Sequence, residues 1–198
     1  MASQINQIDP ADHPPGNRFL LYAPAQMPGL IDAMARQIAP LLAGAEKVAV
    51  IGVLRRGAPL ADRLCEALVR LFQMPMPTRL DLKVKRYADD LTLLHHETQL
   101  TEQQGQAELD LTGYKLLIVD DVLYTGHSLL RVIEWLNAKS PAAIYTAVLA
   151  DRHVAQLPIR ADAVGVHLQV APADVVECHV PPYEALFQIE LLRLEGAA

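Results

Sequence analysis

The apolar residues follow two spacings along the chain, one typical of helices and one typical of buried strands. A recurrence every three or four positions predicts helices over residues 28–43, 58–72 and 128–138. Continuous apolar runs rich in β-branched residues predict strands that are buried on both faces, at residues 48–53, 116–122 and 143–151. Strands and helices therefore alternate over most of the chain.

Weaker patterns add further strands. Residues 78–84 alternate apolar and polar positions, which predicts a strand with one wetter face. After residue 152 several prolines divide the chain into short pieces, with strand candidates at 163–168 and 175–180. Residues 187–194 fit either a helix or a strand, and we favour a strand.

Alternating strands and helices predict an α/β fold in which a parallel sheet is flanked by helices and joined by right-handed crossovers. Ligands bind such sheets at the carboxyl ends of the strands. Three loops leave strand ends there, with the sequences LRRG, DDVLYTGHS and DRHVAQLPIR. We expect these loops to converge on one site.

Length and composition narrow the class of protein. The chain has 198 residues, of which 52% are hydrophobic and 20% charged, as in a globular protein of about one domain. We expect residues 28–198 to form that domain and residues 1–27 to be a loosely attached arm. The net charge of -6 excludes a strongly basic nucleic-acid surface across the whole chain.

Cysteine usage and hydropathy indicate the compartment. Cys65 and Cys178 lie far apart and match no metal-ligand spacing, so we expect two buried, unpaired thiols and a reducing environment. No apolar run approaches the length of about 20 residues that spans a bilayer, and the N-terminus does not resemble a secretory signal. These features predict a cytoplasmic protein with no membrane partner.

Two adjacent carboxylates, Asp120 and Asp121, follow the apolar run at 116–119. Two ionised carboxylates repel each other and therefore need partners. The hydroxyls of a sugar diol would donate hydrogen bonds to them, and a divalent cation would also suit them. A helix cap combined with a surface ion pair is the alternative without a ligand.

The turn Thr125–Ser128 comes next and opens a predicted helix. Free N–H groups and partial positive charge at a helix N-terminus bind phosphate, and Gly126 allows close approach of the backbone. Ser128 could instead be an ordinary N-cap. A ribose phosphate fits the combination, with the diol on the carboxylates and the phosphate on the turn.

The segment IVDDVLYTGHS resembles the phosphoribosyl-pyrophosphate motif of type I phosphoribosyltransferases, because the apolar run, the acid pair and Thr-Gly-x-Ser occur in register. The chain is also similar to the family of pyrimidine-operon attenuation regulators, which act as uracil phosphoribosyltransferases as well. The matching pieces GVLRRGAPLADRL, LDLKVKRYADDLT, VDDVLYTG and LPIRADAVG keep that family's order and span roughly residues 28–170.

This resemblance implies a type I phosphoribosyltransferase fold with a small C-terminal hood at about residues 152–198 and a long flexible loop at about residues 86–112. A disordered insertion is the alternative reading of that loop. The resemblance also implies transfer of phosphoribosyl from phosphoribosyl pyrophosphate to uracil, giving UMP and pyrophosphate. Mg²⁺ would be the cofactor, and the chain would form a homo-oligomer.

The resemblance implies a role for individual residues. Arg55, Arg56, Asp120 and Asp121 would be catalytic, and the two aspartates would meet Mg²⁺ indirectly, through the substrate. Leu54–Gly57 would be the pyrophosphate loop, with a cis peptide bond. The alternative for Arg55 and Arg56 is an exposed pair ahead of a helix. The other substrate-binding positions would be Arg86 in the flexible loop and Val122, Leu123, Tyr124, Thr125, Gly126, His127, Ser128, Arg152, Ile159 and Arg160.

The chain departs from the family in the first helix, where Ala35 and Ala39 replace polar residues that the family uses towards RNA, and at two places in the loops. His127 stands where the family has Arg, and Val154-Ala155 stands where the hood of the family has His-Arg. The lost basic pair and the acidic net charge argue against tight RNA binding, so a uridine-nucleotide-sensing RNA regulator is the second hypothesis. A phosphoribosyltransferase that acts on another base is the third.

Overall fold

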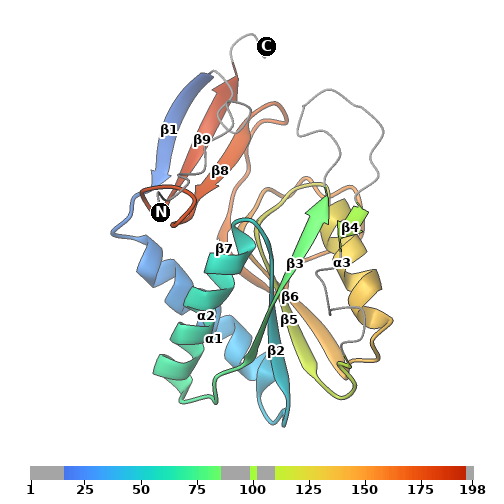
Figure 1. Ribbon diagram of the computed structural model, residues 1–198. Coiled ribbons are helices and arrows are strands. Elements are labelled where there is room, and N and C mark those ends of the chain that lie inside the picture. The colour runs from blue at the N-terminus through green and yellow to red at the C-terminus, as the bar shows by residue number, and fades with distance from the viewer. Residues whose placement is uncertain (1–15, 86–98, 102–109, 195–198) are drawn as a thin grey trace, which may run out of the picture.

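The computed structural model describes residues 16–85, 99–101 and 110–194. Its main sheet has six strands in the order β4-β3-β2-β5-β6-β7 (Figure 1). Five of them are parallel, and β4 pairs antiparallel with β3 at one edge. The strands are β2 (Val48–Leu54), β3 (Thr78–Lys85), β4 (Gln99–Thr101), β5 (Lys115–Leu123), β6 (Ala143–Asp151) and β7 (Ala163–His167).

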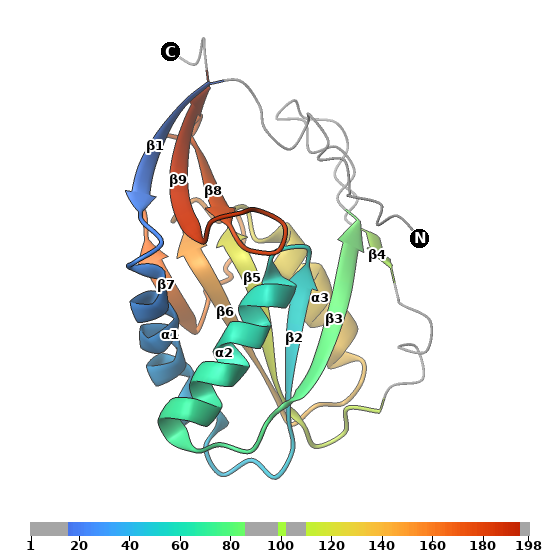
Figure 2. The same cartoon turned by 60° about the vertical axis from the view of Figure 1, so that its left-hand side comes forward.

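Helices cover both faces of this sheet, as the alternation of elements predicted. The helices α1 (Met27–Leu42) and α2 (Gly57–Phe72) lie on one face, and α3 (His127–Asn137) lies on the other (Figures 1 and 2). The predicted α/β class with a parallel sheet flanked by helices is therefore confirmed.

Alternate residues of a central strand pack against the helices on opposite faces of the sheet. In β5, Leu117 and Val119 pack in a cluster with α1 and α2, whereas Leu116 and Ile118 pack in a second cluster with α3. All four side chains are fully buried. A strand with both faces covered must be apolar at every position, which explains the continuous apolar run in the sequence.

A second, three-stranded antiparallel sheet stands beyond the carboxyl ends of the parallel strands (Figure 2). We call it the hood sheet; it consists of β1 (Gly16–Tyr22), β9 (Gln188–Leu194) and β8 (Val175–His179), in that order. Its buried residues Val176, Cys178 and Ile189 join the same cluster as α1 and α2. The hood sheet is thus packed onto the main domain.

Two boundaries predicted from the sequence are wrong. Residues 16–22 belong to the hood sheet, where β1 pairs with β9 at the opposite end of the chain, and are therefore not a loosely attached arm. Residues 163–167 form the edge strand β7 of the main sheet, so they do not belong to the hood. The hood combines both ends of the chain rather than only the C-terminal one.

The predicted long loop at 86–112 falls mostly outside the described residues. Within it, residues 99–101 form the short strand β4, which the sequence reading missed. The short segment at 110–112 is described as well, with the amide of Thr112 bound to Asp110 Oδ1.

The two cysteines are free and buried, as predicted. Burial raises the pKa of the Cys65 thiol to about 11, so this thiol stays protonated at neutral pH. Among the described residues, no helix is both long and apolar enough to cross a bilayer.

Candidate active site at the carboxyl edge of the sheet

The two adjacent carboxylates lie inside β5, which continues to Leu123. Neighbouring side chains in a strand leave opposite faces. The alternation is interrupted at the acid pair, because Val122 packs with the α1 and α2 cluster, as Val119 does, whereas Leu123 packs with the α3 cluster. Asp120 is 6% exposed, and its Oδ1 accepts the amide of Asp121 at 2.9 Å. The acid pair therefore lies near the carboxyl end of the central strand.

The loop after β2 brings Arg56 to Asp121 and Arg55 to Tyr183. The peptide bond between Leu54 and Arg55 is cis, as the resemblance implied. Arg56 places Nη1 3.9 Å from Asp121 Oδ2. Arg55 lies over the ring of Tyr183, 5.5 Å from its centroid. Arg55 is exposed and Arg56 is half-buried, and both precede α2, so the alternative of an exposed pair ahead of a helix describes Arg55 but not Arg56, which Glu184 binds.

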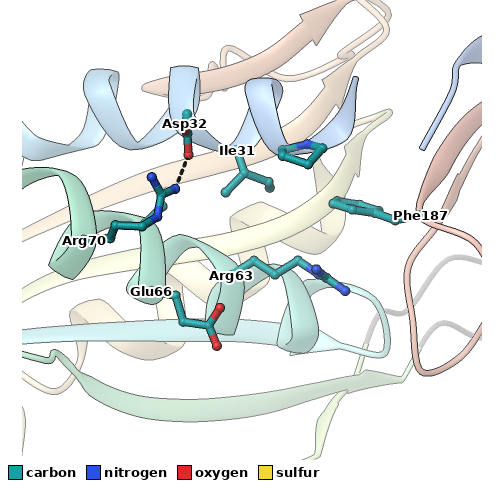
Figure 3. Close-up of a pocket in the computed structure, with 8 residues that line it drawn as sticks. Ile31, Asp32, Arg63, Glu66, Arg70 and Phe187 are labelled. Atoms are coloured by element: carbon teal, nitrogen blue, oxygen red, sulfur yellow. Dashed lines mark hydrogen bonds and ion pairs between the residues drawn. The ribbon is translucent and has the colours of Figure 1, made fainter. Parts of the chain in front are cut away.

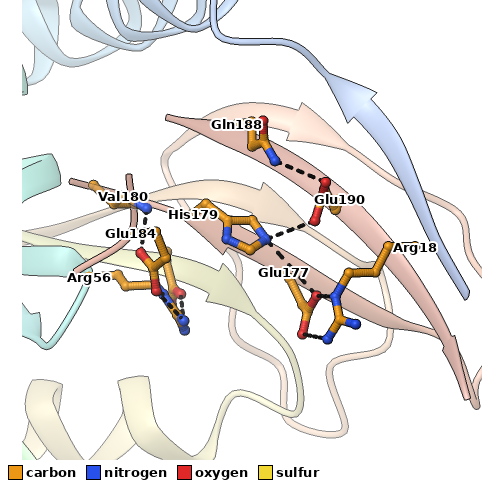
Figure 4. Close-up of polar contacts among 9 residues, drawn as sticks. Arg18, Arg56, Glu177, His179, Val180, Glu184, Gln188 and Glu190 are labelled. Carbon is orange, nitrogen blue, oxygen red and sulfur yellow. Dashed lines mark hydrogen bonds and ion pairs between the residues drawn. The ribbon is translucent and has the colours of Figure 1, made fainter. Parts of the chain in front are cut away.

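Glu184 holds Arg56 from the hood side (Figure 4). Its Oε1 accepts Nε and Nη2 of Arg56 at 2.9 and 2.6 Å, and its Oε2 accepts the amide of Val180 at 2.7 Å. Burial by itself would lower the pKa of Arg56, but the hydrogen bond to Glu184 and the charge of Asp121 raise it above its ordinary value. Arg56 therefore remains a cation with two carboxylate neighbours.

Tyr183 and Glu184 are site residues that the sequence reading missed. They lie in the turn that connects β8 and β9, far along the chain from Arg55 and Arg56. The only signal in the sequence is the Pro181-Pro182 pair, which predicts a turn ahead of two polar side chains.

The segment Thr125–Ser128 opens α3, as predicted. Helix α3 begins at His127, and Gly126 is its N-cap with a φ of 88° and no side-chain cap. Ser128 therefore lies in the first turn and is not the N-cap. His127 is exposed, and its Nδ1 lies 3.1 Å from Thr125 Oγ1. The first turn of α3 thus has N–H groups that no side chain caps, which is suited to an anion.

Helix α2 begins in the same way. Its N-cap is Arg56, again with no side-chain cap, and its first turn has no acidic residue. The N-termini of α2 and α3 follow β2 and β5, which are neighbouring strands of the sheet. Two helix N-termini with partial positive charge therefore lie at one edge, on either side of the acid pair.

The loop after β6 is attached to the turn before α3. The amide of Arg152 donates to Leu123 O at 3.3 Å, and the amide of Gln156 donates to Thr125 O at 3.1 Å. Ile159 packs against the core cluster on the α3 side and lies close to Gly126. The converging loops that the sequence predicted are thus in direct contact.

Several expected substrate contacts have other partners in this structure. The guanidinium of Arg152 is buried, donates to Ala171 O and Asp174 O, and lies 4.5 Å from the centroid of the Tyr124 ring. Burial lowers its pKa. The carbonyl of Arg160 accepts Thr146 Oγ1. Val122 and Leu123 belong to β5, and Arg86 lies outside the described residues.

A separate pocket lies between α1 and α2, against Phe187 (Figure 3). Arg63 stacks over the Phe187 ring at 4.7 Å, and Arg70 binds Asp32. This pocket does not include the acid pair or the loops after β2 and β5. We therefore place the candidate site at the carboxyl edge and not here.

The acid pair has the donor chemistry that suits a shared Mg²⁺. Mg²⁺ prefers oxygen ligands and is usually held by one or two carboxylates together with phosphates of the substrate. Asp120 and Asp121 provide hard oxygen donors at the ligand edge. They are not in a group of three or more candidate ligands within the described part of the chain. The residues present therefore fit an ion held mainly by a substrate.

Comparison with protein families gives one match over most of the chain. A family model described as "Phosphoribosyl transferase domain" matches residues 22–184. Among curated proteins, the bifunctional protein PyrR of Deinococcus deserti is 37% identical over 163 residues, which cover 82% of this chain and 87% of that protein. The bifunctional protein PyrR of Thermus thermophilus is 35% identical over 179 residues, which cover 90% of this chain and 97% of that protein.

Solved structures share the fold. The hypoxanthine phosphoribosyltransferase of Trypanosoma cruzi in complex with the product IMP superimposes with a TM-score of 0.68, at 22% sequence identity. The match covers 90% of this chain and 95% of that chain. At this low sequence identity, the comparison shows a shared arrangement of the sheet, helices and hood, and no more than that.

Proposed function

The chain belongs to the phosphoribosyltransferase family, as a type I member close to the bifunctional PyrR proteins, and on that premise we propose that its acceptor is uracil. The reaction would transfer phosphoribosyl from phosphoribosyl pyrophosphate to uracil, giving UMP and pyrophosphate. One observation carries the proposal: the acid pair, two uncapped helix N-termini and Arg56 lie together at the carboxyl edge of the main sheet.

Each part of phosphoribosyl pyrophosphate has a complementary group at this edge. Asp120 and Asp121 would accept hydrogen bonds from the ribose hydroxyls. The first turn of α3, with Thr125 and Ser128, would bind the 5-phosphate through N–H and hydroxyl donors. Arg55, Arg56 and the N-terminus of α2 would bind the pyrophosphate, on the other side of Asp121.

These groups also serve the chemical step. Negative charge builds up on the pyrophosphate as its bond to the ribose breaks, and prepositioned cations stabilise that charge most. Arg56 is fixed for this role by two hydrogen bonds to Glu184. When bound, Mg²⁺ would supply further neutralisation of the pyrophosphate charge. The hood would cover the reacting centre and exclude water that competes with the base.

The base would be read beside the loop after β6. We propose that backbone groups of residues 152–160 supply the donors and acceptors for the edge of uracil, with Ile159 beside the ring. The side chain of Arg152 is bound elsewhere and its amide donates to Leu123 O, so its contribution would come from its backbone carbonyl. Cytoplasmic location and self-association remain proposals, and light scattering after gel filtration would measure the latter.

A panel of bases tests the acceptor. We expect pyrophosphate release from phosphoribosyl pyrophosphate and Mg²⁺ with uracil, and little release with hypoxanthine, guanine or no base. Release with a purine alone would assign the chain to another acceptor. Failure to release pyrophosphate with any base in the panel would contradict the proposed transfer.

A regulator that binds RNA is the second candidate, supported by the resemblance to pyrimidine-operon attenuation regulators. The net charge of -6 and the residues Val154 and Ala155 are unfavourable for phosphate contacts. A shift of labelled RNA on a gel at physiological salt, dependent on a uridine nucleotide, would support this candidate.

Glu184→Gln should strengthen the binding of phosphoribosyl pyrophosphate by roughly fivefold. The carboxylate of Glu184 neutralises Arg56 and would repel the pyrophosphate. Two unit charges about 4 Å apart interact by about 1 kcal/mol at the dielectric constant of water, which corresponds to the expected change in affinity. Calorimetry with the wild type and the variant measures the change. Glu134→Gln, on the exposed surface of α3, should leave the affinity unchanged. Weaker binding by Glu184→Gln would mean instead that Glu184 mainly positions Arg56.

A further inference from the structure

A second cluster of ionisable side chains lies at the same edge of the sheet, and it includes His153 from the segment proposed to read the base. Asp151 ends β6 and His167 ends β7, and the two residues are register partners in the parallel ladder. His153 follows two residues after Asp151. Its ring stacks on that of His167, with centroids 4.9 Å apart. Three potential metal ligands thus meet at the carboxyl ends of two neighbouring strands.

From this arrangement we propose that Asp151, His153 and His167 bind a divalent transition-metal ion of the Zn²⁺ class. One ligand atom of each residue lies within 4.8 Å of the others. His153 Nε2 is 3.0 Å from His167 Nδ1, and His167 Nδ1 is 3.9 Å from Asp151 Oδ2. Bonds of about 2.0–2.1 Å to one tetrahedral ion require ligand atoms roughly 3.4 Å apart. Small rotations of the two rings would reach that spacing.

The carboxylate of Asp151 points towards the two histidines of the cluster. Asp151 Oδ1 accepts the amide of His153 at 2.8 Å, which leaves Oδ2 facing the two imidazole rings. The side chain of Asp151 is 13% exposed, whereas those of His153 and His167 are 45% and 60% exposed. The neighbouring cation Arg152 donates to Ala171 O and Asp174 O, and it does not occupy this carboxylate.

The backbone at His153 has a positive φ, as it has at Gln73 and Ser140, so this conformation orients the side chain but does not by itself mark a site. The φ of His153 is 55°, in the left-handed region that side chains rarely adopt. Histidine adopts this region more often than most other non-glycine residues do. This conformation turns the side chain of His153 towards His167.

The donor set decides the class of metal. Two imidazoles and one carboxylate suit Zn²⁺ and its neighbours in the first transition row, whereas Mg²⁺ prefers oxygen alone. Three protein ligands leave a fourth position for water or a substrate atom, as in sites of the catalytic type. The site would therefore be distinct from the Mg²⁺ that the acid pair would share with substrate.

A second group, Glu177, His179 and Glu190 in the hood sheet, is a weaker candidate. Glu177 already binds Arg18 through Oε2 and Oε1 at 2.8 and 3.3 Å (Figure 4). Glu190 Oε1 accepts Gln188 Nε2, and His179 Nε2 lies 3.0 Å from Glu190 Oε2. A guanidinium that binds one of the carboxylates disfavours a cation there, because the two positive charges repel each other.

Titration calorimetry of the full chain with ZnCl₂ tests the proposal, in a buffer free of phosphate and substrate. We expect one Zn²⁺ per chain, with no competition from excess Mg²⁺. His153→Gly and His167→Asn should each lower the affinity by roughly 100-fold or more, since even outer-shell partners of a metal are worth about 10- to 100-fold. His153→Gly is the cleaner variant, because glycine accepts the positive φ and keeps the loop conformation.

His179→Asn is the matched control and should bind Zn²⁺ like the wild type. Thermal unfolding of all variants checks that each is folded. The proposal is overturned if the wild type binds no Zn²⁺, if both His153→Gly and His167→Asn bind as the wild type does, or if His179→Asn alone loses binding. Because substrate is absent, this result is independent of whether the chain transfers phosphoribosyl.

Discussion

Asp121→Asn is expected to weaken the binding of phosphoribosyl pyrophosphate by roughly 10- to 100-fold. Asparagine has nearly the same shape, so it can still accept the amide of Val122 that Asp121 Oδ1 binds at 2.9 Å. What it loses is the negative charge. A hydrogen bond to a charged group is worth about 1.5–3 kcal/mol, and about 1.4 kcal/mol corresponds to a tenfold change in affinity.

The position of Asp121 explains why this substitution should act on the donor. Its Oδ2 lies 3.9 Å from Arg56 Nη1, at the junction between the proposed ribose and pyrophosphate positions. Calorimetry with Mg²⁺ and phosphoribosyl pyrophosphate measures the loss. Glu134→Gln makes the same chemical change on the surface of α3 and should bind normally. An unchanged affinity for Asp121→Asn would refute the diol assignment.

Gly57→Ala is expected to destabilise the protein by about 3 kcal/mol, at the upper end of the range for an overpacked core. A Cβ at this position would lie 2.4 Å from Val119 O and 3.2 Å from Asp120 Cα, both in the backbone of β5. Backbone atoms of the central strand cannot rotate away as a flexible side chain would. The first turn of α2 would have to move away from β5 instead.

That movement would also damage the site, because Arg55 and Arg56 immediately precede Gly57. We expect a melting temperature roughly 6–12 °C lower and weaker binding of phosphoribosyl pyrophosphate. Gly29→Ala is the matched control, since a Cβ there meets nothing within 4 Å in the first turn of α1. It should leave the stability unchanged or raise it by about 0.5 kcal/mol. Equal melting temperatures for Gly57→Ala and the wild type would contradict the contact with β5.

The alternative acceptors and the metal proposal concern the same part of the molecule. Val154 and Ala155, where the chain departs from the related family, follow directly after His153 in the loop after β6. This loop contacts the turn before α3 through Gln156 and Ile159. An ion at Asp151, His153 and His167 would restrain the start of the segment proposed to read the base. The base panel repeated with and without Zn²⁺ would measure that connection.

The predictions from the sequence missed features that depend on contacts between distant segments. Strand β1 carries Phe19 and Leu20 with about half of each side chain exposed, so no buried apolar pattern marks it. It forms because its backbone pairs with β9, near the other end of the chain. Glu184 likewise reaches Arg56 only after the turn between β8 and β9 packs over the loop after β2.

The sequence by itself determined the α/β class, the β6 boundaries at Ala143–Asp151, and the strands and turns that carry Asp120, Asp121 and Thr125–Ser128. These follow from local spacing, because burial on both faces of a sheet requires an unbroken apolar run and a helix requires a repeat of about 3.6 residues. Only the tertiary structure decided that Arg56 lies beside Asp121, that Glu184 binds Arg56, and that Asp151, His153 and His167 meet. Those contacts join residues from different elements, and their geometry depends on how the elements pack.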